Sequence, residues 1–198
     1  MFKAIHKQLI IFAFFSLLSS NLMAENNVDH KIAVLVNEEV ITSYDIIQRL
    51  KLTSLIQGIN INNQNNQLLL NNTVDELIQE KVKIEKINEY KIKVEDNEYL
   101  EYETNFLRRK NIEQSQFFLL LEKNNINYVE FKNLLLIDLS WGKLISGLFY
   151  RLTSVTDLEI NEIISKNPSI SSAQAENLVI QRQLDLQSSK LLRDIMNE

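Results

Sequence analysis

The sequence predicts a mostly helical single domain, with a small β-hairpin near its N-terminus and a C-terminal helix that packs back on the core. Three observations support this fold class. The chain has only 3 glycines and 1 proline in 198 residues, and this scarcity favours long helices. Apolar residues recur at helical spacing through most of the chain. Only residues 31–42 alternate as a half-buried strand does.

Residues 1–24 have the features of a secretory signal peptide. Lys3 and Lys7 give a positive start, residues 9–18 are apolar, and a cleavage site is expected after Ala24. The apolar run is about half of the roughly 20 residues that a membrane-spanning helix needs. We therefore expect cleavage rather than retention as an anchor, with no stable membrane insertion afterwards.

The first elements of the mature chain are expected to be the hairpin and a helix. Ile32, Val34 and Val36 alternate with their neighbours in KIAVLVNEEVIT, and polar residues interrupt the run before it resumes. A lone hairpin is marginally stable in water, so it must pack on helices. Thr42 or Ser43 can cap the helix that follows.

Three further helices are expected at residues 69–90, 96–109 and 113–122, after a solvated loop rich in Asn and Gln. Each has apolar side chains at a spacing that would place them on one face. The inward residues predicted are Val74, Leu77, Ile78, Ile84 and Ile87 in the first helix, Leu100 and Phe106 in the second, and Phe117, Leu120 and Leu121 in the third.

Residues 127–152 predict the central helix. Asn127 stands three residues before Glu130, as in a capping box. Two adjacent apolar stripes follow, which indicates contact on two sides. We interpret this as a core helix; the alternative is that part of its surface is open to a partner. The stripes are Phe131, Leu135, Ile145, Phe149 and Leu152, and Leu134, Ile137, Trp141, Leu144 and Leu148.

Two helices complete the predicted fold. Thr156 with Glu159 predicts a capping box before a short helix that ends at Asn167-Pro168. Ser171 with Gln174 predicts another, before a last helix that ends near Met196 and should dock on the body. Its apolar face comprises Leu178, Val179, Leu184, Leu191, Leu192 and Ile195. The predicted domain is 25–198, with a main body at 25–166, a short linker at 167–171 and the C-terminal helix at 172–198.

The sequence offers no set of residues for catalysis, metal binding or a cofactor. After signal cleavage the only histidine is His30, and cysteine is absent. The acid pairs Glu38-Glu39, Glu95-Asp96 and Glu101-Glu103 are interpreted as turns and solvated helix faces. The formal net charge is −5, and loss of two lysines with the signal peptide would make it −7. Such a chain is a poor candidate for nucleic-acid binding.

Aromatic side chains supply the candidate binding surface. Phe117-Phe118 and Phe149-Tyr150 are adjacent pairs, and neighbours in a helix point about 100° apart, so both members are hard to bury together. We expect Phe118 and Tyr150 to be exposed. The candidate surface comprises Phe118, Trp141, Phe149 and Tyr150, which either bind extended apolar polypeptide or fill gaps between helices.

The order of these segments resembles that of the SurA-type periplasmic chaperones. The resemblance rests on the hairpin before SYDIIQRL, on DELIQEKV leading to KIKVEDNEYL, on NYVEFKNLLLIDLSWGKLI, and on the final LVIQRQLDLQ. It implies that the helical body and the last helix form one module, located in the periplasm, that binds unfolded outer-membrane proteins without a cofactor.

One feature departs from that family. Members of the family carry parvulin-type prolyl isomerase domains between the body and the last helix, and such a domain needs on the order of a hundred residues. In this chain only residues 167–171 separate the body from the last helix. The resemblance therefore implies a chaperone core that is not an enzyme and carries over no catalytic residue. The alternatives are a prolyl isomerase and a structural subunit of envelope assembly with one fixed partner.

Overall fold

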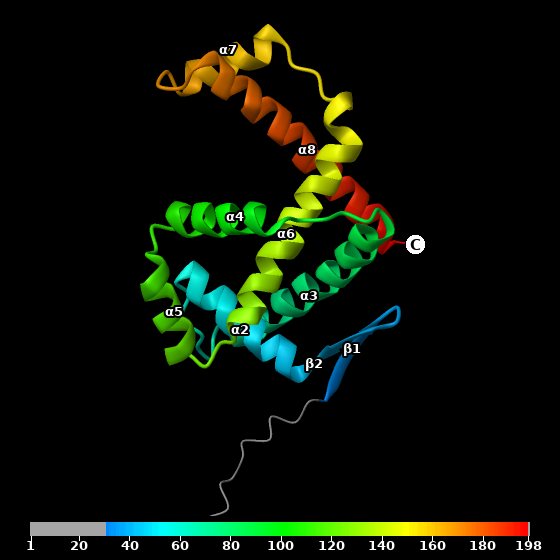
Figure 1. Ribbon diagram of the computed structural model, residues 1–198, viewed down its shortest axis with the longest axis vertical. Coiled ribbons are helices and arrows are strands. Elements are labelled where there is room, and N and C mark those ends of the chain that lie inside the picture. Colours follow the sequence, from blue (N-terminus) through cyan, green and yellow to red (C-terminus); the bar gives the residue numbers. More distant parts are fainter. Residues whose placement is uncertain (1–30, 198) are drawn as a thin grey trace, which may run out of the picture. The chain divides into compact units, whose positions relative to one another are not determined.

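The computed structural model describes residues 31–197 (Figure 1). The signal peptide and cleavage site predicted in residues 1–24 lie outside the described residues. Residues 31–197 form a mostly helical fold, with seven α-helices and one antiparallel hairpin. The elements are β1 (Ile32–Val36), β2 (Glu39–Thr42), α2 (Ser43–Gln57), α3 (Asn66–Glu89), α4 (Asp96–Arg109), α5 (Gln114–Lys123), α6 (Tyr128–Phe149), the 3₁₀ turn η1 (Tyr150–Leu152), α7 (Asp157–Lys166) and α8 (Ser172–Met196).

The hairpin forms where the alternation predicted it. Val36 pairs with Glu39 across a tight turn in which Asn37 has a positive φ of 52°, a conformation that Asn tolerates better than most residues. The strand pair is anchored by Ile41, which is fully buried against Ile46 of α2 and Leu77 of α3. The expectation that the hairpin packs on helices is confirmed.

Local capping signals set most of the helix boundaries. Thr42 and Asp45 form a capping box at the start of α2, and Gly58 ends that helix with a φ of 67°. The boxes predicted at Thr156 and Ser171 are also present, at the starts of α7 and α8. These predictions are confirmed because a cap needs only residues that are close together in the chain.

The capping box predicted at Asn127 does not form. The Asn127 side chain accepts a hydrogen bond from the backbone N–H of Val129, but the Glu130 carboxylate binds the Arg49 guanidinium instead of turning back to the cap. The helix also ends sooner than expected, because residues 150–152 tighten into η1.

Four apolar residues predicted to face inward point toward solvent. Leu100 is 60% exposed because the buried face of α4 is formed by Tyr99, Glu103 and Leu107, at a spacing of four residues. The neighbouring position is rotated about 100° from that face. Leu120 and Leu178 are exposed in the same way, each next to a buried residue of its own helix, whereas Leu152 is exposed in the 3₁₀ turn beyond the end of α6.

Helix α6 joins two parts of the core. Its N-terminal half supplies Phe131 and Leu135 to a cluster with α2, α4 and α5. Its C-terminal half supplies Leu144 and Ile145 to a second cluster with α3 and α8. Contact on two sides, predicted from the two apolar stripes, is therefore confirmed (Figure 1).

Helix α8 returns to the body, as predicted. Leu184 is buried against α6, and the indole N–H of Trp141 donates a hydrogen bond of 2.8 Å to Ser188. The first turns of α8 pack on α7 through Ala175 and Val179. Within residues 31–197, no helix combines the length and the hydrophobicity needed to cross a membrane.

Candidate functional site

A cleft of about 700 Å³ lies where α3, α4, α6 and α8 meet. One face of α6 supplies most of its surface, including Leu139, Gly142 and Ile145, and α8 supplies Leu184 opposite. Trp141 borders the cleft although only 5% of its surface is exposed. The cleft therefore has an apolar floor made by the helices of the second core cluster.

Trp141 is held in place by two contacts. Its N–H donates to the Ser188 hydroxyl on α8, and the Lys83 ammonium of α3 lies 5.8 Å from the centre of its ring. A cation at this distance is attracted by the electrons of the indole face. Three helices thus fix the orientation of the tryptophan at the edge of the cleft.

The polar rim of the cleft is largely bonded within the chain. The Tyr102 hydroxyl donates to Asp138, and burial together with this carboxylate raises the pKa of Tyr102 to about 12, so the phenol is neutral at physiological pH. The Lys143 ammonium likewise joins α6 to α4, because it donates to both carboxylate oxygens of Glu98 at 2.7 Å. The hydrogen bond to Lys143 is the main cause of a lowered Glu98 pKa.

The four aromatic residues predicted as a binding surface do not form one site. Trp141 and Phe149 belong to the second core cluster, where Phe149 is partly buried. Tyr150 follows in η1 and is 56% exposed. Phe118 lies on α5, where its ring meets Tyr128 edge to face at 5.2 Å between centroids. The predicted exposure of Phe118 and Tyr150 is confirmed, whereas the role of the four in binding stays a prediction.

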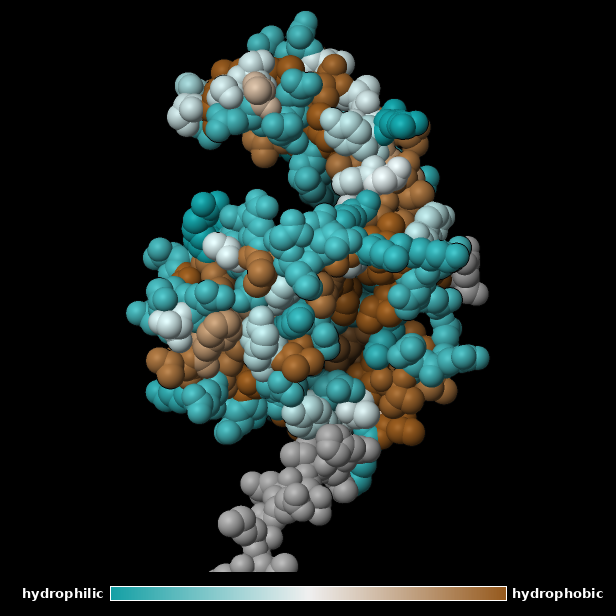
Figure 2. Space-filling model, in the orientation of Figure 1, coloured by the Kyte–Doolittle hydropathy of each residue, from teal (hydrophilic) through white to brown (hydrophobic). Residues whose placement is uncertain are grey.

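Hydrophobic side chains also reach the surface away from the cleft. Figure 2 shows hydrophobic residues over the region of α5 and over the hairpin. On α5 three consecutive residues are exposed, namely Phe118, Leu119 and Leu120. The hairpin exposes Ile32 and Leu35. Contiguous apolar surface of this kind is typical of interaction sites.

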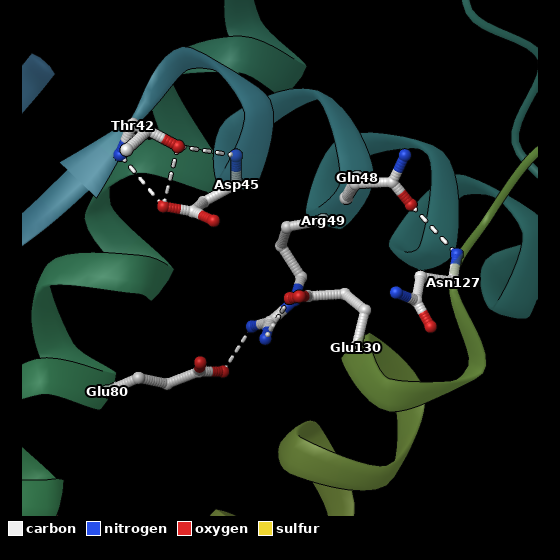
Figure 3. Close-up of polar contacts among 7 residues, drawn as sticks. All are labelled: Thr42, Asp45, Gln48, Arg49, Glu80, Asn127 and Glu130. Atoms are coloured by element: carbon white, nitrogen blue, oxygen red, sulfur yellow. Dashed lines mark hydrogen bonds and ion pairs between the residues drawn. The ribbon is translucent and has the colours of Figure 1, made fainter. Parts of the chain in front are cut away.

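A buried ionic cluster, which was not predicted from the sequence, joins α2, α3 and α6 (Figure 3). The Arg49 side chain is 2% exposed, and its guanidinium donates to Glu80 and, at 2.9 Å, to Glu130. Its Nε atom is buried and has no hydrogen-bond partner among residues 31–197, and the Arg49 side chain lines a pocket of about 160 Å³. Ile46 and Leu52 stand three residues before and after Arg49, so its place on the apolar face of α2 was the signal available in the sequence.

The cluster changes the acidity of its members. Burial alone would lower the pKa of Arg49, but the hydrogen bonds and charges of Glu80 and Glu130 outweigh it and raise that pKa. Burial raises the pKa of Glu130, against the opposing effect of the Arg49 charge. Glu80 and Asp45 add to the rise because their negative charges disfavour ionisation of Glu130.

A buried carboxylate on α4 corrects the interpretation of Glu101-Glu103 as a solvated pair. Glu103 is 2% exposed and accepts hydrogen bonds from the hydroxyls of Tyr99 and Tyr128 and from the Gln114 amide. It thereby links α4, α5 and the first residue of α6. Glu103 follows Tyr99 by four residues, which places both on the inward face of α4.

Within the described range 31–197, no group of three or more His, Cys, Asp or Glu side chains is placed to hold a metal ion. Neither a scan against protein-family models nor a search of curated proteins found a match to this chain.

Proposed function

We propose that this chain is a periplasmic, ATP-independent holdase chaperone of the SurA kind, which binds unfolded outer-membrane proteins. In this proposal residues 1–24 direct export, and residues 25–198 form one chaperone domain. That domain comprises a body at 25–166, a linker at 167–171 in place of an isomerase domain, and a closing helix at 172–198. Both the resemblance in the sequence and the properties of the cleft support it.

The single observation that carries the proposal is the character of the cleft. A site that selects one small ligand presents a few polar groups that converge on it. Here most polar groups of the rim are already bonded to one another, as in Tyr102 with Asp138 and Gln181 with Asp185. What remains for an occupant is an apolar floor and a neutral rim, which suits adaptable contacts with many polypeptides.

Exposed aromatic and aliphatic side chains outside the cleft extend the surface that a client can touch. Tyr150 and Leu152 of η1 and Phe118 of α5 each expose apolar area to solvent. Strands of outer-membrane proteins alternate apolar and polar residues, so the unfolded chain carries many small apolar sites. Several weak contacts along one chain give useful affinity through their linkage.

The proposal is tested by light scattering during dilution of a urea-unfolded outer-membrane β-barrel protein. The purified mature protein is expected to suppress aggregation at a near-stoichiometric ratio. Tyr150→Ser should weaken the suppression because it removes an exposed client contact. Tyr90→Ser is the matched control, since Tyr90 is half exposed at the end of α3. Absence of suppression by the wild-type protein would refute the proposal.

Two alternative functions give different results in two further assays. A prolyl isomerase would accelerate cis–trans exchange of a proline-containing peptide, and we expect no acceleration. A structural subunit with one fixed partner would recover a single stoichiometric protein from an envelope extract. A holdase is instead expected to recover a range of outer-membrane proteins.

A further inference from the structure

Gly142 lies at the centre of the α6 face that floors the cleft. Asp138, Leu139, Ile145 and Ser146 also line the cleft, and each is three or four positions from Gly142. Residues at these spacings surround a position on one helix face. Because Gly142 has no side chain, the backbone of α6 is uncovered at the middle of the cleft floor.

No contact within the described chain explains a glycine at this position. A Cβ atom built on Gly142 would have no atom within 4 Å in the described residues, and its φ lies outside the range that favours glycine. Glycine in a helix interior lowers stability relative to alanine. The missing side chain instead leaves open space above the helix backbone, on the side where an occupant of the cleft would lie.

The charges of the cleft indicate what can lie there. Its lining contains Lys83 and Lys143 and, balancing them, Asp138 and Asp185. A neutral lining attracts neither a phosphate nor a metal cation strongly, but it suits the neutral backbone of a polypeptide.

The rim also distinguishes an extended polypeptide from a helix. The Lys83 ammonium contacts Trp141 through its charge and keeps its N–H donors, and the Asp185 carboxylate accepts one hydrogen bond from Gln181 and has further acceptor positions, so extended backbone N–H and C=O groups can use both. A helix has already satisfied most of its own backbone groups and would gain less from this rim.

We infer that Gly142 is the point of closest approach for the backbone of an extended client segment, and that it controls which chains fit the cleft. This inference rests on the proposed holdase function and assigns the client-binding surface to the cleft. An added methyl group at Gly142 would lift the client chain away from the apolar floor and from the rim groups together.

The test compares Gly142→Ala with Gly147→Ala. Gly147 is on the same helix, also has no atom within 4 Å of a built Cβ, and does not line the cleft. Both variants should be slightly more resistant to urea than the wild type, because each replaces a helix-interior glycine. The measured quantity is the Kd for a fluorescein-labelled, tryptophan-free, urea-unfolded outer-membrane β-barrel protein. We expect Gly142→Ala to raise it about tenfold and Gly147→Ala to leave it unchanged.

Trp141 gives an independent readout because it is the only tryptophan in the chain. Binding of the tryptophan-free client is expected to change its emission in the wild type and Gly147→Ala, and less in Gly142→Ala at equal client concentration.

Equal Kd values for the two variants, with a client-binding wild type, would overturn the inference alone. A wild type that binds no client would overturn the proposed function as well. A change in self-association of Gly142→Ala, with client binding intact, would mean that a second copy fills the cleft and would also overturn the inference.

Discussion

The buried side chain of Arg49 joins α2 to α3 and α6 through its ion pairs with Glu80 and Glu130. A buried ion pair often adds little net stability, because removal of the charges from water offsets their attraction. Loss of one partner is costly, however, at about 3–5 kcal/mol, since it leaves a charge buried without compensation. Glu80 and Glu130 therefore act together on Arg49, and their arrangement fixes α3 and the start of α6 against α2.

A pH-dependent contribution follows from the raised pKa of Glu130. Burial and the nearby carboxylates favour its protonated form in the folded state. Its contribution to stability is thus fully present below about pH 4.3, the ordinary glutamate pKa, and is lost as the pH rises through the raised value. We expect the unfolding free energy of the wild type, relative to that of Glu130→Gln, to fall as the pH rises from about 4.3 through the raised pKa of Glu130.

Urea denaturation at a series of pH values from acidic to neutral measures this difference. Glu176→Gln on exposed α8 surface is the control and should follow the wild-type profile. Parallel profiles for Glu130→Gln and the wild type would contradict the prediction.

The helices show which features can be read from a sequence and which cannot. Caps at Thr42, Thr156 and Ser171 are local, so they were predicted correctly. The cap at Asn127 was only partly predicted because Glu130 is bound by Arg49, 81 residues earlier in the chain. Side-chain direction depends on neighbouring helices in the same way, which is why Leu100 was assigned to the wrong face and the burial of Glu103 was missed.

Substitutions of glycine by alanine test the assigned helix end at Gly58 and the helical conformation at Gly147. Gly58 ends α2 with a φ of 67°, a conformation that costs an L-residue about 1–2 kcal/mol. Gly58→Ala is therefore expected to destabilise the protein by about that amount. Gly147→Ala, within α6, should instead stabilise it by about 0.5–1 kcal/mol. Urea denaturation of both variants checks the opposite signs, and equal shifts would exclude the assigned role of Gly58.

At the scale of the whole domain, α6 and α8 organise the candidate cleft. The central helix was predicted from its two apolar stripes, and the return of α8 from its amphipathic pattern. The cleft itself was not predicted, because it arises where four helices meet and includes residues from α3 to α8. Of the four aromatic candidates, only Trp141 borders it, and its indole lies at the edge rather than exposed to solvent.

The packing of α8 on the body is tested by Leu184→Ala. Leu184 is buried in the cluster that contains Trp141, so its truncation should cost about 2–5 kcal/mol. It should also shift the Trp141 emission to longer wavelength, because water gains access to the indole. Leu186→Ala is the control, since Leu186 is mostly exposed on the same helix. A negligible effect of Leu184→Ala would mean that α8 is not held as described.

The continuity of α8 has a structural consequence. Its 25 residues contain no glycine or proline and extend over about 37 Å as one rigid rod. Near one end Ala175 is seated on α7, and toward the other Ser188 holds the indole of Trp141. One unbroken helix therefore connects the apolar contact with α7 to the hydrogen bond that orients the indole.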